Sequence, residues 1–215
     1  MIKNIFFDFD GVIVDSVNVK TQAFEKLYAP YGKNISQKVV EHHQANGGMS
    51  RYEKFKFYHK QFLGNEIDEK EVDKLANQFS LLVKQGVIDS PEVKGSHDFI
   101  KKYSDRFNMF VITGTPTQES IAICKARGIL HYFKGIYGSP NKKEYWTKYI
   151  LNEYDLNSTE TIFVGDAMAD YNAAMQANLR FYLRDYHENK EIFRNIGNVV
   201  RFKDFNDFEN LIINK

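Results

Sequence analysis

The sequence contains almost no cysteine, since Cys124 is the only one among its 215 residues. A single thiol cannot form an internal disulfide framework, and it cannot build a cysteine-rich metal site. Low cysteine content also fits a reducing compartment. We expect Cys124 to lie buried in a helix as a small apolar side chain.

An excess of charge of one sign is also missing, because 29 Lys and Arg face 28 Asp and Glu and leave a net charge of +1. This balance argues against a polyanion-binding surface, so no nucleic-acid partner is expected. No apolar run approaches bilayer-spanning length, so no membrane partner is expected either. The amino terminus lacks the features of a signal peptide, which predicts a cytoplasmic location. The sequence leaves the oligomeric state open.

Apolar and aromatic residues are plentiful: 43% of the residues are hydrophobic, and 18 Phe and 13 Tyr are enough to build a core. Short apolar segments alternate with segments of helical spacing. Strands are predicted over 2–9, 107–112, 161–165, 180–184 and 199–202. Helices are predicted over 16–30, 117–127, 143–154, 168–177 and 204–213. This alternation predicts an α/β fold with a parallel sheet and right-handed crossovers.

The segment from about residue 36 to 86 breaks this alternation, because its pattern is helical throughout. Gly47-Gly48 and Gly64-Asn65 interrupt it, and helices are predicted over 51–62 and 68–85. No strand candidate occurs in this stretch. The pattern therefore predicts an α/β core with an all-helical insert.

We place the α/β catalytic core in residues 1–15 and 91–215, and the helical cap in residues 16–90. An insert after the first strand is expected over the carboxyl ends of the strands. Open α/β sheets bind their ligands at that edge. Polar residues that follow the predicted strands are therefore the first candidates for a functional site.

Two carboxylates follow the first predicted strand, in Asp8-Phe9-Asp10-Gly11. Alternation along a strand places Asp8 and Asp10 on the same side. Paired carboxylates attract a hard cation, and they divide their roles when their environments differ. Alternatively, the pair is an ordinary solvated turn, because Asp-x-Asp also recurs by chance.

A second acidic pair, Asp166 and Asp170, follows the predicted strand over 161–165. The alternative role is helix capping, because Asp is a good N-cap and favours the first turn of a helix. Both roles can hold at once. Two acidic pairs, each at the carboxyl end of a strand, are harder to attribute to chance than one.

Thr113-Gly114-Thr115 ends a third apolar segment just before a predicted helix. Hydroxyls and free amides at a helix start favour an anion, although capping alone explains the triplet more simply. Lys143 is a further candidate. A lone lysine usually lies at the surface, but a cation near four carboxylates and a phosphate would hold their charges together.

Taken together, Asp8-Phe9-Asp10-Gly11-Val12, Thr113-Gly114, Lys143 and Gly165-Asp166 with Asp170 resemble, in order and spacing, the four motifs of the haloacid dehalogenase-like superfamily. The resemblance covers essentially the whole chain. It is to the phosphatase branch with a small helical cap, which includes phosphoglycolate phosphatases and β-phosphoglucomutases. It implies a Rossmann-like parallel core. The dehalogenases lack the second Asp of the first motif, so Asp10 points to phosphoryl chemistry.

The resemblance implies Mg²⁺-dependent hydrolysis of a small phosphorylated metabolite, such as a sugar phosphate or a phosphoglycolate-like acid. Asp8 would attack phosphorus and become an aspartyl phosphate. Asp10 would protonate the leaving alcohol and then activate water. Asp8, the Asp10 backbone carbonyl and Asp166 would hold the metal. Asp170 would hold metal-bound water or orient Lys143.

The remaining motif residues are expected to hold the phosphoryl group. Thr113 and the Gly114 amide would contact its oxygens, and Lys143 would neutralise the phosphate and the nucleophile. Lys142 is adjacent, and the form of the motif favours Lys143.

Arg51 is the candidate substrate-binding residue of the cap. It lies in a Gly-x-Ser-Arg segment that also occurs in the caps of β-phosphoglucomutase-like relatives, where the arginine meets a substrate phosphate. Here it would bind a second anionic group through bidentate contacts. Alternatively, Arg51 faces solvent at the start of a helix.

Two other functions remain open at this stage. A phosphomutase of the β-phosphoglucomutase kind would share every motif. A non-catalytic binding or scaffold protein would keep the fold alone, but clustered carboxylates repel one another and are costly to retain without a cation. Release of phosphate from a panel of phosphate esters separates these alternatives.

Overall fold

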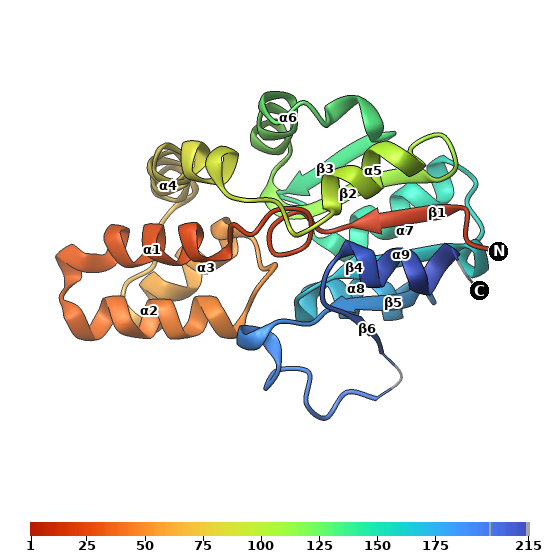
Figure 1. Ribbon diagram of the computed structural model, residues 1–215. Coiled ribbons are helices and arrows are strands. Elements are labelled where there is room, and N and C mark those ends of the chain that lie inside the picture. Colours follow the sequence, from red (N-terminus) through yellow and green to blue (C-terminus); the bar gives the residue numbers. More distant parts are fainter. Residues whose placement is uncertain (198, 214–215) are drawn as a thin grey trace.

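The centre of the molecule is a parallel sheet with the strand order β3-β2-β1-β4-β5-β6 (Figure 1). The computed structural model describes residues 1–197 and 199–213. β1 lies between β2 and β4, so the strand order reverses at β1, which is where open sheets bind ligands. The strands in these residues are β1 (Asn4–Phe7), β2 (Asn108–Pro116), β3 (Gly135–Ser139), β4 (Thr161–Gly165), β5 (Arg180–Arg184) and β6 (Val200–Phe202).

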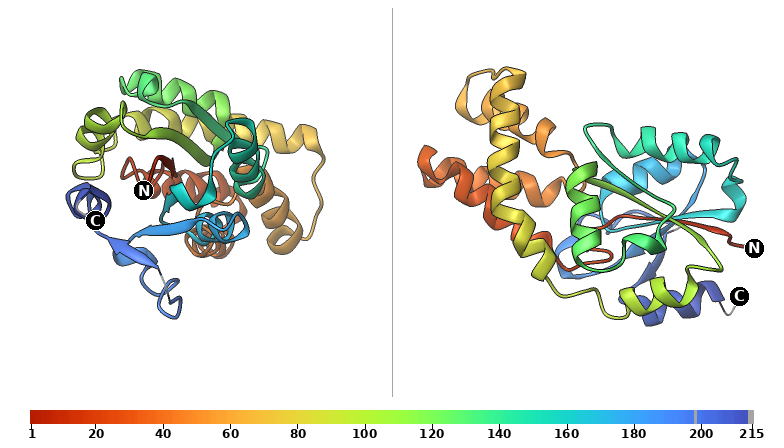
Figure 2. Two further views of the ribbon diagram at one scale, coloured as in Figure 1. Left: turned by 90° about the vertical axis from the view of Figure 1, so that its right-hand side faces the viewer. Right: turned by 90° about the horizontal axis from the view of Figure 1, so that it is seen from above.

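Helices cover both faces of this sheet (Figure 2). Successive strand residues point to opposite faces, so Ile5 and Phe7 pack with one group of helices and Phe6 with the other. The first group is α5 (Ser96–Tyr103), α6 (Thr117–Ala126) and α9 (Phe205–Ile213), and the second is α7 (Lys143–Glu153) and α8 (Met168–Gln176). The predicted α/β fold with a Rossmann-like parallel sheet is confirmed.

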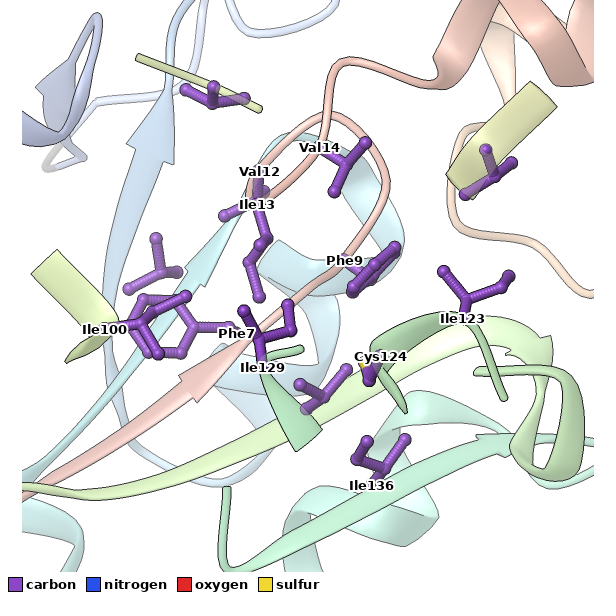
Figure 3. Close-up of a cluster of buried hydrophobic side chains, with 14 of the residues drawn as sticks. Phe7, Phe9, Val12, Ile13, Val14, Ile100, Ile123, Cys124, Ile129 and Ile136 are labelled. Atoms are coloured by element: carbon purple, nitrogen blue, oxygen red, sulfur yellow. The ribbon is translucent and has the colours of Figure 1, made fainter. Parts of the chain in front are cut away.

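The turn after β1 is buried as firmly as the strand itself (Figure 3). Phe9, Val12 and Val14 are at most 2% exposed, and they belong to the same hydrophobic cluster as Ile123 and Cys124 of α6. The backbone around the two aspartates that follow β1 is therefore fixed by apolar packing. Cys124 is buried in a helix, as predicted.

Four helices lie together beside the sheet, toward the carboxyl ends of its strands (Figure 1). They are α1 (Val17–Tyr28), α2 (Lys33–Ala45), α3 (Arg51–Tyr58) and α4 (Glu69–Asp89), called the cap helices below. Aromatic rings fill their centre: the ring of Phe24 lies 4.3 Å from that of Phe79 and 5.8 Å from that of Phe55. We propose that residues 16–90 form a cap on a core of residues 1–15 and 91–215.

The sequence prediction missed two elements of the core. β3 reads Gly-Ile-Tyr-Gly-Ser, and glycine is a poor strand former. It is held in place at the edge of the sheet by pairing with β2. α5 has only eight residues and is held by its buried side chains Phe99 and Ile100. Tertiary packing, rather than local propensity, forms both elements. Among the described residues, no helix has the length and apolar character needed to cross a bilayer.

Candidate active site

Three carboxylates meet at the carboxyl end of the sheet. Oxygen atoms of Asp8, Asp166 and Asp170 all lie within 4.8 Å of one another, and all three residues are buried. Asp8 directly follows β1, and Asp166 directly follows β4. The two strands pair in parallel, and the Asp8 amide continues the ladder by donating to the Val164 carbonyl at 2.9 Å. The sheet itself therefore brings the two predicted acidic pairs together.

Asp170 also serves the helix that carries it. Its Oδ2 accepts hydrogen bonds from the backbone amides of Asp166 and Ala167, at 3.3 and 3.1 Å. These contacts satisfy donors at the start of α8. Its Oδ1 faces the cluster. Asp170 therefore caps α8 and also belongs to the acidic cluster.

Lys143 is the cation inside this acidic cluster. Its Nζ lies 2.6 Å from Asp170 Oδ1 and 2.9 Å from Asp8 Oδ1, and its side chain is only 3% exposed. Lys142 instead pairs with Glu53 at the surface, and its side chain is 68% exposed. The geometry thus places the second of the two lysines, the one that the motif favours, beside the proposed nucleophile.

The cluster fits a small divalent cation. Asp8 Oδ1 is buried, and beyond its ion pair with Lys143 at 2.9 Å it has no hydrogen bond among the described residues. Burial, together with the carboxylates of Asp170 and Asp166, raises the pKa of Asp8 well above its usual value despite the Lys143 charge. A bound cation would relieve this repulsion, and carboxylate oxygens are the ligands that Mg²⁺ prefers.

Asp10 lines the same cavity as Asp8 but has different hydrogen-bond partners. β1 ends at Phe7, and the chain turns after Phe9, whose carbonyl accepts hydrogen bonds from the amides of Ile13 and Val14. The Asp10 carboxylate accepts hydrogen bonds from Ser16 Oγ at 2.6 Å, from Thr115 Oγ1 at 3.2 Å and from Lys20 Nζ.

The two aspartates consequently differ in acidity. Burial alone would raise the pKa of Asp10, but the Lys20 charge and the hydrogen bonds from Lys20, Ser16 and Thr115 hold it below its usual value. Asp10 is thus a carboxylate in this arrangement, whereas the pKa of Asp8 is raised. Neighbouring carboxylates with opposite pKa shifts suit different roles.

Thr113 and Gly114 lie at the end of β2 and line the same cavity as the aspartates. The capping explanation for this triplet is wrong, because α6 begins only at Thr117. Gly114 has a steric role: a Cβ there would lie 2.7 Å from the Gly48 carbonyl oxygen. The backbone of the loop before α3 therefore lies directly over the end of β2.

A cavity of about 860 Å³ lies between the cap helices and the carboxyl ends of the strands. Its core side includes Asp8, Thr113 and Asp166, and its cap side includes His43 and Lys54. This volume is large enough for a small metabolite. Asp8 and Asp166 of the acidic cluster lie in the wall of this cavity.

Arg51 lines the cavity but does not face solvent. Its guanidinium donates to both carboxylate oxygens of Glu119 in α6, at 2.7 and 2.9 Å, and to Ser80 Oγ at 2.6 Å. The predicted contact with a second substrate anion would compete with Glu119. Arg51 as a substrate ligand stays a prediction.

Three further contacts at the site were not predicted. Lys20 binds Asp10, the Tyr186 hydroxyl donates to Asp166 Oδ2 at 2.6 Å, and Asn189 donates to the Asp166 carbonyl at 2.9 Å. Lys20 could have been suspected, since it is the fourth residue of the helix that follows the first acidic pair. Tyr186 had none, because an ordinary-looking loop after β5 carries it.

We expect Mg²⁺ to bind more weakly as the pH falls below about 7. Burial and the Asp170 carboxylate raise the pKa of Asp166 to about 7. The protonated form grows as pH falls, and its proton must leave before the metal binds. The dissociation constant should rise about tenfold per pH unit for one displaced proton. Calorimetric titrations across this range measure it, and a constant value would contradict the prediction.

Comparisons with solved structures place this geometry among known folds. The chain matches a predicted phosphatase from Clostridium acetobutylicum with a TM-score of 0.79 at 19% identity, covering 100% of both chains. It matches a β-phosphoglucomutase from Clostridium difficile with a TM-score of 0.77 at 20% identity, covering 100% of this chain and 96% of that one.

A predicted phosphoglycolate phosphatase from Haemophilus somnus 129PT matches with a TM-score of 0.72 at 20% identity, covering 100% of this chain and 98% of that one. At these identities the likeness establishes the fold. No curated protein matches the sequence. The model of the family described as haloacid dehalogenase-like hydrolase matches residues 5–183. Since that match spans most of the sequence, the chain belongs to the haloacid dehalogenase-like hydrolases.

Proposed function

We propose that the protein is a Mg²⁺-dependent phosphatase that hydrolyses a small phosphorylated metabolite through an aspartyl phosphate on Asp8. The observation that carries the proposal is the buried cluster of Asp8, Asp166 and Asp170 around Lys143, open to a cavity of about 860 Å³. Phosphoryl transfer depends on positioning and on charge stabilisation, and this cluster offers both.

Asp8 would attack phosphorus in line, and the bond to the leaving oxygen would break. Asp8, the Asp10 backbone carbonyl and Asp166 would hold Mg²⁺, which offsets the charge of the phosphoryl oxygens. Asp170 orients Lys143 through their 2.6 Å contact. Lys143 would neutralise the nucleophile and the phosphate. Thr113 and Gly114 would hold the phosphoryl oxygens.

Asp10 would act as acid in the first half of the reaction and as base in the second. Its contact with Lys20 keeps it ionised, which suits proton removal from the water that hydrolyses the aspartyl phosphate. To protonate the leaving alcohol, Asp10 must first gain a proton. That requires the Lys20 contact to loosen when substrate binds.

A panel of phosphate esters with and without Mg²⁺ tests the proposal. We expect release of inorganic phosphate that requires Mg²⁺ and stops with a chelator. Isomerisation of a sugar phosphate without net phosphate release would instead identify a phosphomutase. No turnover of any ester with any divalent metal would favour a binding or scaffold protein.

A further inference from the structure

The ion pair between Arg51 and Glu119 joins the cap helices to the core. Arg51 begins α3, and Glu119 lies in the first turn of α6. Their side chains are only 4% and 8% exposed, and the contact is bidentate. Ser80 of α4 hydrogen-bonds to both partners, and the guanidinium lies 4.6 Å from the centre of the Phe79 ring. The Arg51 guanidinium is therefore held by Glu119 and Ser80.

The lysines and arginines that line the cavity all have partners within the protein. Of the four in the described part of the chain, three have carboxylate partners, in the pairs Lys20–Asp10, Arg51–Glu119 and Arg184–Asp15. The fourth, Lys54, lies 2.7 Å from His43 Nδ1. Burial and the Lys20 charge lower the pKa of Lys54 well below its usual value. Among the described residues, Lys54 is thus the one lysine or arginine of the cavity wall without a carboxylate partner, and it is held by His43 in surroundings that favour its neutral form.

Uncharged polar groups are available on the cap side instead. Burial lowers the pKa of His43 well below its usual value, which favours the neutral ring. Neutral donors and acceptors suit hydroxyl groups, whereas burying an anion without a partner charge is strongly unfavourable. The uncharged polar side chains from the cap helices that line the cavity are Asn18, Thr21, His43 and Gln44.

We propose that Glu119 is a specificity-determining residue: by neutralising Arg51, it makes the cavity select phosphate monoesters with an uncharged, hydroxyl-bearing leaving group against substrates with a second anionic group. The inference rests on the proposed phosphatase function and narrows its substrate class. Glu119 acts through Arg51 and does not touch the substrate. Removing its charge should therefore change substrate preference, not only overall rate.

Two substrate pairs test the proposal: 2-hydroxyethyl phosphate against 2-phosphoglycolate, and a hexose monophosphate against the corresponding bisphosphate. In the wild-type enzyme, kcat/KM should favour the first member of each pair by about tenfold or more. Glu119→Gln should shift the ratio toward the second member by about tenfold, mainly through KM, because Arg51 gains an unneutralised charge. The double variant Arg51→Gln/Glu119→Gln should return the wild-type preference.

A wild-type enzyme without this preference would overturn the inference, and that comparison does not depend on any variant folding. An equal loss of kcat/KM for both members of a pair in Glu119→Gln would also overturn the inference. So would a shift of substrate preference that persists in the double variant. Thermal melting of each variant separates loss of fold from change of preference. Failure of the wild type on every phosphate ester would refute the phosphatase function itself, which is a different result.

Discussion

Asp8→Asn should lower kcat on the order of 10³-fold or more while the protein stays folded. The carboxamide cannot attack phosphorus as a carboxylate does, and it weakens the metal site that Asp8 shares with Asp166. The melting temperature of the metal-free variant should not fall, because the raised pKa of Asp8 reflects burial and repulsion from its neighbours, which a neutral side chain removes.

Asp105→Asn is the matched control, since Asp105 is an exposed loop residue far along the chain from the acidic cluster. It should keep wild-type rates with every phosphate ester. Phosphate release measured under saturating substrate and Mg²⁺ gives kcat for both variants. Full activity in Asp8→Asn would remove this residue from the nucleophile role, whatever the control shows.

Lys143→Gln should cost both activity and stability. It leaves Asp8 and Asp170 buried without their cation, and breaking a buried ion pair in this way typically costs about 3 kcal/mol. Loss of the charge beside the phosphoryl group should lower kcat on the order of 100-fold. Mg²⁺ should recover part of the stability, because it supplies positive charge to the same carboxylates.

The neighbouring substitution Lys142→Gln provides a control of the same chemistry one residue away. The Lys142 ammonium pairs with the partly exposed Glu53 at the surface, so its loss should change stability by at most about 0.5 kcal/mol and leave kcat near wild type. Thermal denaturation and phosphate release measure both effects. A larger loss of activity in Lys142→Gln than in Lys143→Gln would reverse the assignment of the site lysine.

The sequence predicted most of the sheet because its strands are short runs of apolar residues bounded by polar ones. Asp8 and Asp166 were found for the same reason: each directly follows such a run, and parallel pairing brings the ends together. Two short core elements were not predicted, because β3 is glycine-rich and the eight-residue helix α5 is held by long-range packing.

The contacts between side chains were harder to predict from the sequence than the positions of the site residues. Nothing local in the sequence shows that Arg51 meets Glu119, since 68 positions separate them and the contact depends on how the cap helices lie against α6. Tyr186 was missed because it lies in a loop after β5, 20 positions from Asp166, whereas Lys20 was missed although it lies only 10 positions from Asp10. Asp8 and Asp10 both line the cavity, in agreement with the alternation, but the hydrogen-bond partners of Asp10 could not be predicted from it.

The central place of β1 has a consequence for biosynthesis. β1 is made first, yet its two partners, β2 and β4, begin only at Asn108 and Thr161. Until β2 leaves the ribosome, both edges of β1 lack hydrogen-bonded neighbours, and one edge stays unpaired until β4 follows. Unpaired strand edges favour aggregation. The helices encoded in between rely on contacts close in sequence and can form earlier. A nascent chain that ends before Asp166 therefore holds Asp8 but cannot yet bring it together with Asp166 and Asp170.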